Sequence, residues 1–260
     1  MANKELDNEV NRSINATEKD IENFVLRLDK FLSTNARKIL KKIKTGKDSG
    51  LATAKALGAL ETELYNAGLG DYFVELENIY VNEYKSIRKT FEIATNQKLV
   101  LNDVDLDVAE SLINFKADIV QGKVSQYIYN INDAVLSSVF GGDVPDIDQV
   151  LETYGSKIAS NIKSEINTGV AGFNRTVTLK KANDLGLDKF VYIGSLDSIT
   201  RPFCRKIVGK VFTTAQIKAM DNGQGLDVMT YGGGYNCRHQ WSPVSDELAK
   251  DYGYTDSKAG

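Results

Sequence analysis

Both cysteines, the only histidine and the only tryptophan of this 260-residue chain lie in its last quarter. Cys204 belongs to one short segment, residues 197–204. A second segment, residues 236–243, contains Cys237, His239 and Trp241. Thiol and imidazole groups bind metal ions, form disulfides and serve as nucleophile or base in catalysis. We therefore expect any specific chemistry of the chain to lie where these two segments meet.

Three interpretations of the cysteine and histidine pattern are open. The first is a zinc site formed by Cys204, Cys237 and His239, with Asp197 as the candidate fourth ligand, because thiolate and imidazole groups suit zinc. The second is a disulfide between the two cysteines, which requires an oxidising environment. The third, which we favour, needs no cofactor. In it both cysteines are small buried residues beside Trp241, and a local carbonyl or carboxylate satisfies His239.

The polar residues of the two segments predict a structural clamp. The Asp197 carboxylate follows a predicted strand and can accept main-chain N–H bonds and pair with Arg201 or Arg238, which would lock the segments together. The predicted clamp comprises Asp197, Arg201, Cys204, Asn236, Cys237, Arg238, His239 and Trp241. We expect no catalysis, because one histidine cannot supply both the base and the metal ligand of a His-Asn-His-type nuclease. A Cys–His nucleophile pair would lack an identifiable third group.

The elements that position these residues are predicted to be helical up to residue 174. Apolar residues recur every three, four or seven positions from Val10 to Ile43, which predicts a first helix of roughly forty residues. A break is expected at Gly46–Gly50. Further helices are predicted from Leu51 to Tyr65, from Asp71 to about Asn96, from Asp105 or Asp107 to Gly141, and from Pro145 to Phe173.

Beyond residue 174 the pattern changes, because glycine, proline and threonine become frequent and the apolar period shortens. Strands are predicted at Lys189–Gly194, Lys210–Thr213 and Cys237–Trp241, with a short helix after Thr214 and a hairpin or close backbone approach at Gly232–Gly234. The fold class is therefore mainly α, an elongated bundle of long helices followed by a small α+β C-terminal module. The expected domains are a helical body (1–174), the module (175–250) and a flexible tail (251–260).

Composition limits the function classes. The net charge of −3 and the pI near 5.4 give no global attraction to nucleic acid or anionic lipid. Apolar runs are too short for a membrane span, and the first residues lack the apolar core of a signal peptide, so we expect folding in a cytosol and no membrane partner. The basic residues Arg37, Lys41, Lys42 and Lys44 complement the first helix dipole, or alternatively form a DNA-contacting tip.

The C-terminal region resembles one protein family. The order of strand, Asp197, Arg201 and Cys204, then Gly209-Lys-Val-Phe, a glycine-rich loop, and Asn236-Cys-Arg-His before Pro243 is similar to the C-terminal module of the phage Mu protein F-like (MuF) minor head proteins. The resemblance covers residues 173–244. The chain departs from the family pattern where many members carry Cys-x-x-Cys and Cys-Arg-Cys, since only Cys204, Cys237 and His239 are present here.

The resemblance implies a structural role in head morphogenesis. A protein of this family would be incorporated into the virion near the portal after assembly in the host cytoplasm. Its partners would be portal protein and major capsid or scaffold protein, with packaged DNA as a further candidate during packaging or ejection. The alternatives are a small metal-dependent nuclease or toxin-like module, and a free DNA-binding protein.

Overall fold

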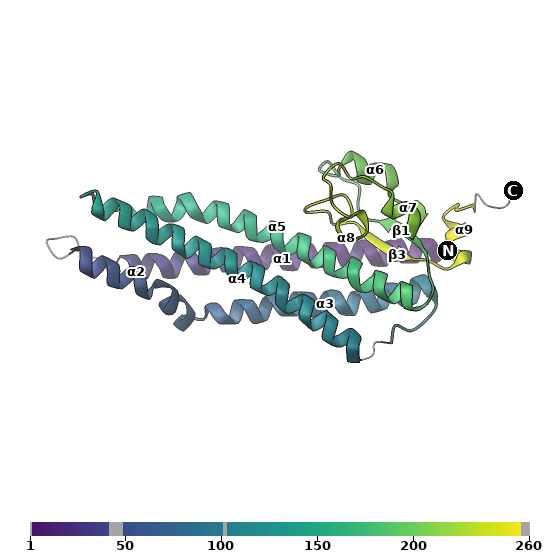
Figure 1. Ribbon diagram of the computed structural model, residues 1–260, viewed down its shortest axis with the longest axis horizontal. Coiled ribbons are helices and arrows are strands. Elements are labelled where there is room, and N and C mark those ends of the chain that lie inside the picture. The colour runs from purple at the N-terminus through teal and green to yellow at the C-terminus, as the bar shows by residue number, and fades with distance from the viewer. Residues whose placement is uncertain (1, 42–48, 101–102, 256–260) are drawn as a thin grey trace. The chain divides into compact units, whose positions relative to one another are not determined.

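The structure is a computed structural model that describes residues 2–41, 49–100 and 103–255. Long helices occupy the chain up to residue 184, and short helices and strands follow (Figure 1). The long helices are α1 (Ala2–Leu40), α2 (Ser49–Asn66), α3 (Leu69–Thr95), α4 (Asp103–Phe140) and α5 (Ile147–Asp184). The later elements are β1 (Lys189–Ile193), α6 (Pro202–Ile207), β2 (Val211–Thr213), α7 (Thr214–Lys218), α8 (Val228–Tyr231), β3 (Gln240–Pro243) and α9 (Asp246–Asp251). The prediction of a mainly α protein with a small α+β C-terminal module is confirmed.

Helix ends follow the predicted stop signals where these lie in the described residues. α3 ends at Thr95, and Asn96 adopts a left-handed φ of 55°. α4 ends at Phe140, followed by Gly142 with a φ of 85°. A positive φ interrupts the main-chain hydrogen-bond pattern of a right-handed helix, so each residue closes its helix. Of the predicted break at Gly46–Gly50, residues 46–48 lie outside the described residues, and α2 already includes residues 49 and 50.

α5 continues through the predicted domain boundary between residues 174 and 175. Its buried stripe extends past Phe173 to Val177 and Ala182, so nothing in the packing ends the helix at 174. The helix closes only at Gly186, whose φ is 68°, where Leu187 N donates to the Ala182 carbonyl. The change in composition that begins at Arg175 therefore does not coincide with a change in secondary structure.

Contacts among the described residues divide the chain into two compact units. One unit combines the chain up to Asp20 with Ile79–Asn114 and the residues from Asn167 onward. The other combines Ile21–Asn78 with Phe115–Ile166, and its described elements are all helices. Its core is formed by apolar stripes of α1, α2 and α4, for example Leu28, Leu60 and Ile131. Each unit is thus built from segments that are distant in sequence.

The unit that contains the C-terminal region is organised around β1. The sheet order is β2-β1-β3 with antiparallel pairing, and Tyr192 of β1 lies opposite Trp241 of β3. One face of β1 presents Val191 and Ile193 to a cluster that includes Leu6, Val10 and Ile14 of α1. The other face presents Phe190 and Tyr192 to a cluster that includes Trp241 and both cysteines. β1 is therefore buried on both of its faces.

The predicted flexible tail differs from the structure up to residue 255. Tyr252 donates hydrogen bonds from its hydroxyl to the Asn3 carbonyl at 3.0 Å and to the Asp7 carboxylate at 2.7 Å. Tyr254 packs against the cluster around Val191. Two aromatic side chains therefore attach this segment to the start of α1, which composition alone did not indicate. Residues 256–260 lie outside the described residues.

Candidate functional site

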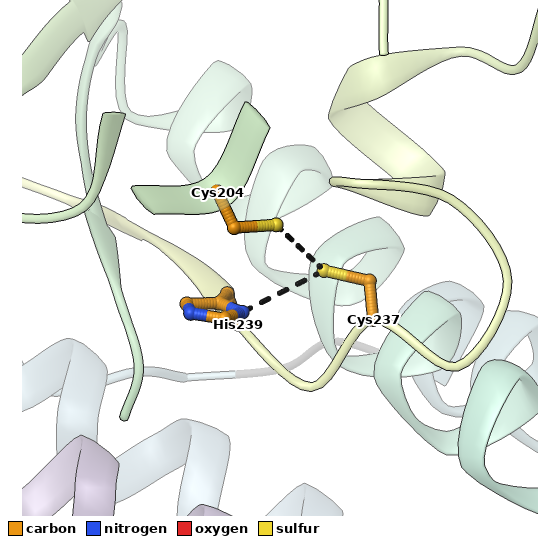
Figure 2. Close-up of side chains that lie close together, drawn as sticks. All are labelled: Cys204, Cys237 and His239. Atoms are coloured by element: carbon orange, nitrogen blue, oxygen red, sulfur yellow. Dashed lines mark hydrogen bonds between the residues drawn. The ribbon is translucent and has the colours of Figure 1, made fainter. Parts of the chain in front are cut away.

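The two cysteine-containing segments meet in one buried cluster. Cys204 comes from α6, whereas Cys237 and His239 come from the loop between α8 and β3. The two Sγ atoms lie 3.7 Å apart, and Nδ1 of His239 lies 3.8 Å from Cys237 Sγ. Figure 2 shows the Cys204 and His239 side chains directed toward the Cys237 sulfur. All three side chains are buried, and their ligand atoms lie within 4.8 Å of one another.

The loop containing Cys237 and His239 corrects the predicted third strand. The strand was expected to begin at Cys237, but β3 begins at Gln240. Asn236 adopts a left-handed φ of 58°, so the chain turns immediately before Cys237. In an extended strand the two side chains would share one sheet face and seldom converge on a point. The turn and loop instead allow both side chains to reach Cys204.

Two glycines allow the close approach of the cluster to the backbone. A Cβ atom on Gly233 would lie 2.3 Å from Cys204 Sγ. A Cβ atom on Gly194 would lie 2.4 Å from Cδ2 of His239. Both distances are far below van der Waals contact, so a side chain at either position would displace the cluster. At Gly232–Gly234, where a hairpin or a close approach of backbones was expected, side chains approach the glycine backbone.

Arg175 holds the loop and was missed by the sequence analysis, which treated it as the first residue of a new domain. Its guanidinium is buried and donates to the carbonyls of Thr230 at 2.9 Å, Cys237 at 2.6 Å and His239 at 3.0 Å. These hydrogen bonds hold the carbonyls of two cluster residues in place. The available signal was an arginine between the buried positions of the α5 stripe, since an unpaired charge there would be costly.

Tyr192 is a second member of the cluster that the sequence analysis did not assign to it. Its hydroxyl lies 3.0 Å from Cys237 Sγ and accepts a hydrogen bond from Gly233 N at 3.1 Å. Its ring stacks on the His239 imidazole, with centroids 5.3 Å apart and planes inclined by 11°. Burial raises the pKa of this tyrosine, so the phenol stays protonated and can donate to sulfur.

The pKa values of the two cysteines are shifted in opposite directions. The hydrogen bond from Cys204 lowers the pKa of Cys237 against the opposing effect of burial, and the same contact raises the pKa of Cys204. Arg175 also favours the Cys237 thiolate by its charge. Of the two thiols, Cys237 is therefore the more easily deprotonated.

The environment of His239 differs from the interpretation that we favoured. A local carbonyl or carboxylate was expected to satisfy the imidazole. Instead, Nδ1 faces the Cys237 sulfur, and the buried Nε2 atom has no hydrogen-bond partner among the described residues. The expected burial of both cysteines in the Trp241 cluster is confirmed. Both cysteines are free thiols, with no disulfide between the two sulfurs.

Asp197 lies in the predicted clamp and outside the group of three candidate ligands. Its carboxylate forms an ion pair with Arg238, and it accepts hydrogen bonds from the Thr200 hydroxyl at 2.8 Å and from Ile199 N at 3.1 Å. The Arg238 contact is the largest cause that lowers the pKa of Asp197 to about 2. Among the described residues, the group that could hold a metal contains Cys204, Cys237 and His239 only. Asp197 is thus an ion-pair partner, not a fourth ligand.

The remaining clamp residues tie the second segment to its surroundings. Arg201 donates to the Tyr235 carbonyl at 2.7 Å. Asn236 N donates to the Thr168 hydroxyl of α5 at 3.0 Å. Arg238 also reaches Glu18 of α1, with 3.0 Å between Nη1 and Oε1. Three separate contacts therefore hold the segment 235–238 against the rest of its unit.

A cavity of about 210 Å³ opens onto the cluster. Its lining includes Cys204, Cys237 and His239 together with Arg201 and Arg238. The three side chains are themselves buried, and Arg201 and Arg238 add cationic side chains to the cavity wall.

The candidate nucleic-acid residues lie apart from this cluster in sequence, near the end of α1. Arg37 pairs with Asp148, with 2.6 Å between Nε and Oδ1, so part of its charge is compensated. Lys41 is exposed. Lys42 and Lys44 lie outside the described residues, and the predicted DNA-contacting tip stays a prediction.

Comparison of the chain with protein-family models, with curated proteins and with solved structures gave no match. A search of the described helices for segments long and apolar enough to cross a membrane found none.

Proposed function

We propose that this chain is a structural minor head protein of a phage, a minor capsid component that acts in head morphogenesis near the portal. The observation that carries the proposal is the ion pair between Asp197 and Arg238, which joins the two segments on which the MuF resemblance rests. Asp197 and Arg238 are 41 residues apart in the sequence. Both segments therefore belong to one folded unit, which supports the proposal.

The contacts of the polar side chains support a structural role more than a catalytic one. The Asp197 carboxylate, the Arg201 guanidinium and the buried Arg175 guanidinium are each engaged in contacts that hold segments of the chain together. Groups committed to such contacts are poorly placed to act as base or nucleophile. The proposed partners are portal protein and major capsid or scaffold protein, with packaged DNA as a further contact. The proposed location is the virion, after assembly in the host cytoplasm.

The test is incorporation into particles. Cells that produce the phage with an epitope-tagged copy of this chain would be lysed, and full and empty heads would be separated by density and analysed by mass spectrometry. The expected result is a constant, substoichiometric amount of the chain relative to major capsid protein in both fractions, together with portal protein. Arg238→Glu, which replaces the ion pair by like charges, should reduce incorporation.

The control for that variant is Arg12→Glu, because Arg12 is exposed and pairs only locally with Glu9 in α1. Absence of the wild-type chain from both head fractions would overturn the proposal. So would a divalent-metal-dependent nuclease activity of the purified chain that disappears in Cys237→Ala, since that result would support the enzyme alternative.

A further inference from the structure

We propose that Cys204, Cys237 and His239 bind one zinc ion through the two Sγ atoms and Nδ1, and that the fourth coordination position faces the cavity and takes an exchangeable ligand. This inference concerns the site alone and does not depend on the proposed role in the phage head.

Two of the three distances between the donor atoms fit tetrahedral coordination. With Zn–S bonds of about 2.3 Å, tetrahedral geometry places two thiolate sulfurs about 3.8 Å apart. The observed Sγ to Sγ distance is 3.7 Å. With a Zn–N bond of about 2.0 Å, the same geometry predicts about 3.5 Å between sulfur and imidazole nitrogen. The observed distance from Cys237 Sγ to His239 Nδ1 is 3.8 Å. The ligand atoms of Cys204 and His239 lie within 4.8 Å of one another, so an approach of these two side chains completes the ligand set.

The donor atoms select the metal class. Two thiolates and one imidazole suit zinc, whereas magnesium and calcium prefer oxygen ligands and iron–sulfur clusters require more cysteines. Two thiolates also neutralise the charge of a divalent ion. A zinc ion would give Nδ1 of His239 a strong partner in place of a 3.8 Å contact with sulfur.

The surroundings of the three residues hold them in position for a metal. Arg175 fixes the carbonyls of Cys237 and His239, and Gly233 and Gly194 leave the space that the sulfur and the imidazole occupy. Such outer contacts orient the ligands before the metal binds. The Tyr192 hydroxyl adds a hydrogen bond to Cys237 Sγ.

The fourth position is assigned to the cavity by elimination among the described neighbours. Asp197 is engaged by Arg238 and Thr200. The Tyr192 hydroxyl already contacts Gly233 N and Cys237 Sγ. All three candidate ligands line the cavity of about 210 Å³, which has room for water or a small anion. Zinc sites with three protein ligands and an open position bind water or another small ligand there.

The first experiment measures metal binding by the full chain. Chelator-treated, reduced protein is titrated with zinc against a chromophoric chelator, and bound metal is measured by elemental analysis. One zinc per folded chain is expected. Cys204→Ser and Cys237→Ser should each weaken binding by more than about 100-fold, and Tyr192→Phe, which keeps the ring, by about tenfold. Asp197→Asn serves as the control and should retain one equivalent.

Cobalt substitution tests the geometry and the open position on the wild-type chain, so the result does not depend on whether a variant folds. Bound Co²⁺ should show thiolate-to-metal charge transfer and the intense visible bands of tetrahedral coordination, and azide should shift those bands. Failure of the reduced, folded wild-type chain to bind zinc would overturn the proposal. Binding that persists in both cysteine variants would overturn the ligand assignment. A cobalt spectrum insensitive to azide would overturn the open position.

Discussion

Arg175 and His239 are 64 residues apart in sequence, yet Nε of Arg175 donates to the His239 carbonyl at 3.0 Å. The same guanidinium bonds the carbonyls of Thr230 and Cys237, so one buried side chain of α5 organises the loop that leads into β3. The candidate site therefore depends on a long helix outside the two segments that contain its cysteines and histidine.

Replacement of Arg175 by methionine should destabilise the unit that contains the site. The variant leaves three carbonyls without their donor in a buried environment, which we expect to cost about 3 to 5 kcal/mol. The measurement is urea unfolding followed by tryptophan fluorescence, because Trp241 belongs to the same unit. Arg175→Lys should cost less, since an ammonium can keep some of the bonds. An unchanged unfolding midpoint in Arg175→Met would show that the hydrogen bonds are not needed.

Replacement of Trp241 by alanine should remove a large part of the cluster on the same face of the sheet. Trp241 is buried, packs against Tyr192 and Phe212, and donates from its indole to the Val228 carbonyl at 3.0 Å. We expect a loss of about 3 to 5 kcal/mol with far-ultraviolet helical circular dichroism largely retained. Thermal unfolding followed in the near ultraviolet would detect it. Trp241→Phe is the milder control, and equal stability of both variants and wild type would contradict the expectation.

Much of the fold could be predicted because its signals are local. Apolar residues at helical spacing predicted α1, and the continuous apolar run from Phe190 to Ile193 predicted β1. The short helix predicted after Thr214 is α7, where the Thr213 hydroxyl accepts from Gln216 N. Each of these depends on residues within one element, so a single sequence is sufficient.

The contacts that define the site could not be predicted in the same way because they are long-range. Arg175 and Tyr192 are ordinary members of a helix and a strand until the fold places them beside Cys237. The start of β3 was also wrong, because the turn at Asn236 and the guanidinium of Arg175 act on the backbone from outside the predicted strand. Sequence composition indicated the three residues that form the cluster, but not the residues that hold them in place.

Asp197→Asn should cause a modest loss of stability that depends on pH. The ion pair with Arg238 is partly exposed, so we expect less than about 1 kcal/mol at neutral pH. The pKa of Asp197 is lowered from 3.8 to about 2 in the folded chain. Its stabilising contribution is therefore complete above pH 3.8 and is lost as the pH falls toward 2. Urea unfolding at several pH values would measure the difference between variant and wild type.

The matched control for that experiment is Asp118→Asn, because Asp118 is exposed on α4. The difference in unfolding free energy between Asp197→Asn and wild type should shrink below pH 3.8, whereas Asp118→Asn should be near wild type throughout. A difference that is constant from neutral pH down to pH 2 would argue against an electrostatic clamp.

Glu83→Gln should remove a pH dependence of stability whose sign is opposite to that expected for Asp197. The Glu83 carboxylate of α3 is buried and accepts hydrogen bonds from Thr17, Asn174 and Gln240. Burial is the largest cause that raises its pKa above 4.5. A raised pKa means that the folded state holds the proton more tightly, so stability decreases as the pH rises from 4.5 through the folded pKa. The variant cannot ionise, and its urea-unfolding stability should lose this decrease.

The glutamine at position 83 can keep the network, because its carbonyl can accept from Asn174 and Gln240 while its amide donates to the Thr17 hydroxyl. Glu83→Leu serves as the comparison that removes every acceptor and should be destabilised at all pH values. If Glu83→Gln kept the same pH dependence as wild type, another titrating group would be responsible for it.

Gly233→Ala should destabilise the candidate site through steric overlap alone. The added Cβ would lie 2.3 Å from Cys204 Sγ and 3.5 Å from Cys237 Sγ, so α6 or the glycine loop must move. We expect a cost of about 1 to 3 kcal/mol. Gly58→Ala is the matched control, because its Cβ would meet nothing within 4 Å in the middle of α2. Alanine there should stabilise the chain by about 0.5 to 1 kcal/mol, since glycine is a poor helix former.

Thiol reactivity distinguishes a displaced cluster from a general loss of stability. In the wild-type chain both cysteines are buried and should react slowly with a chromogenic disulfide reagent. Gly233→Ala should react faster under conditions in which the chain remains folded, because the sulfur of Cys204 must leave its place against the backbone. Gly58→Ala should react at the wild-type rate. Wild-type reactivity and stability in Gly233→Ala would mean that Cys204 does not lie against the glycine loop.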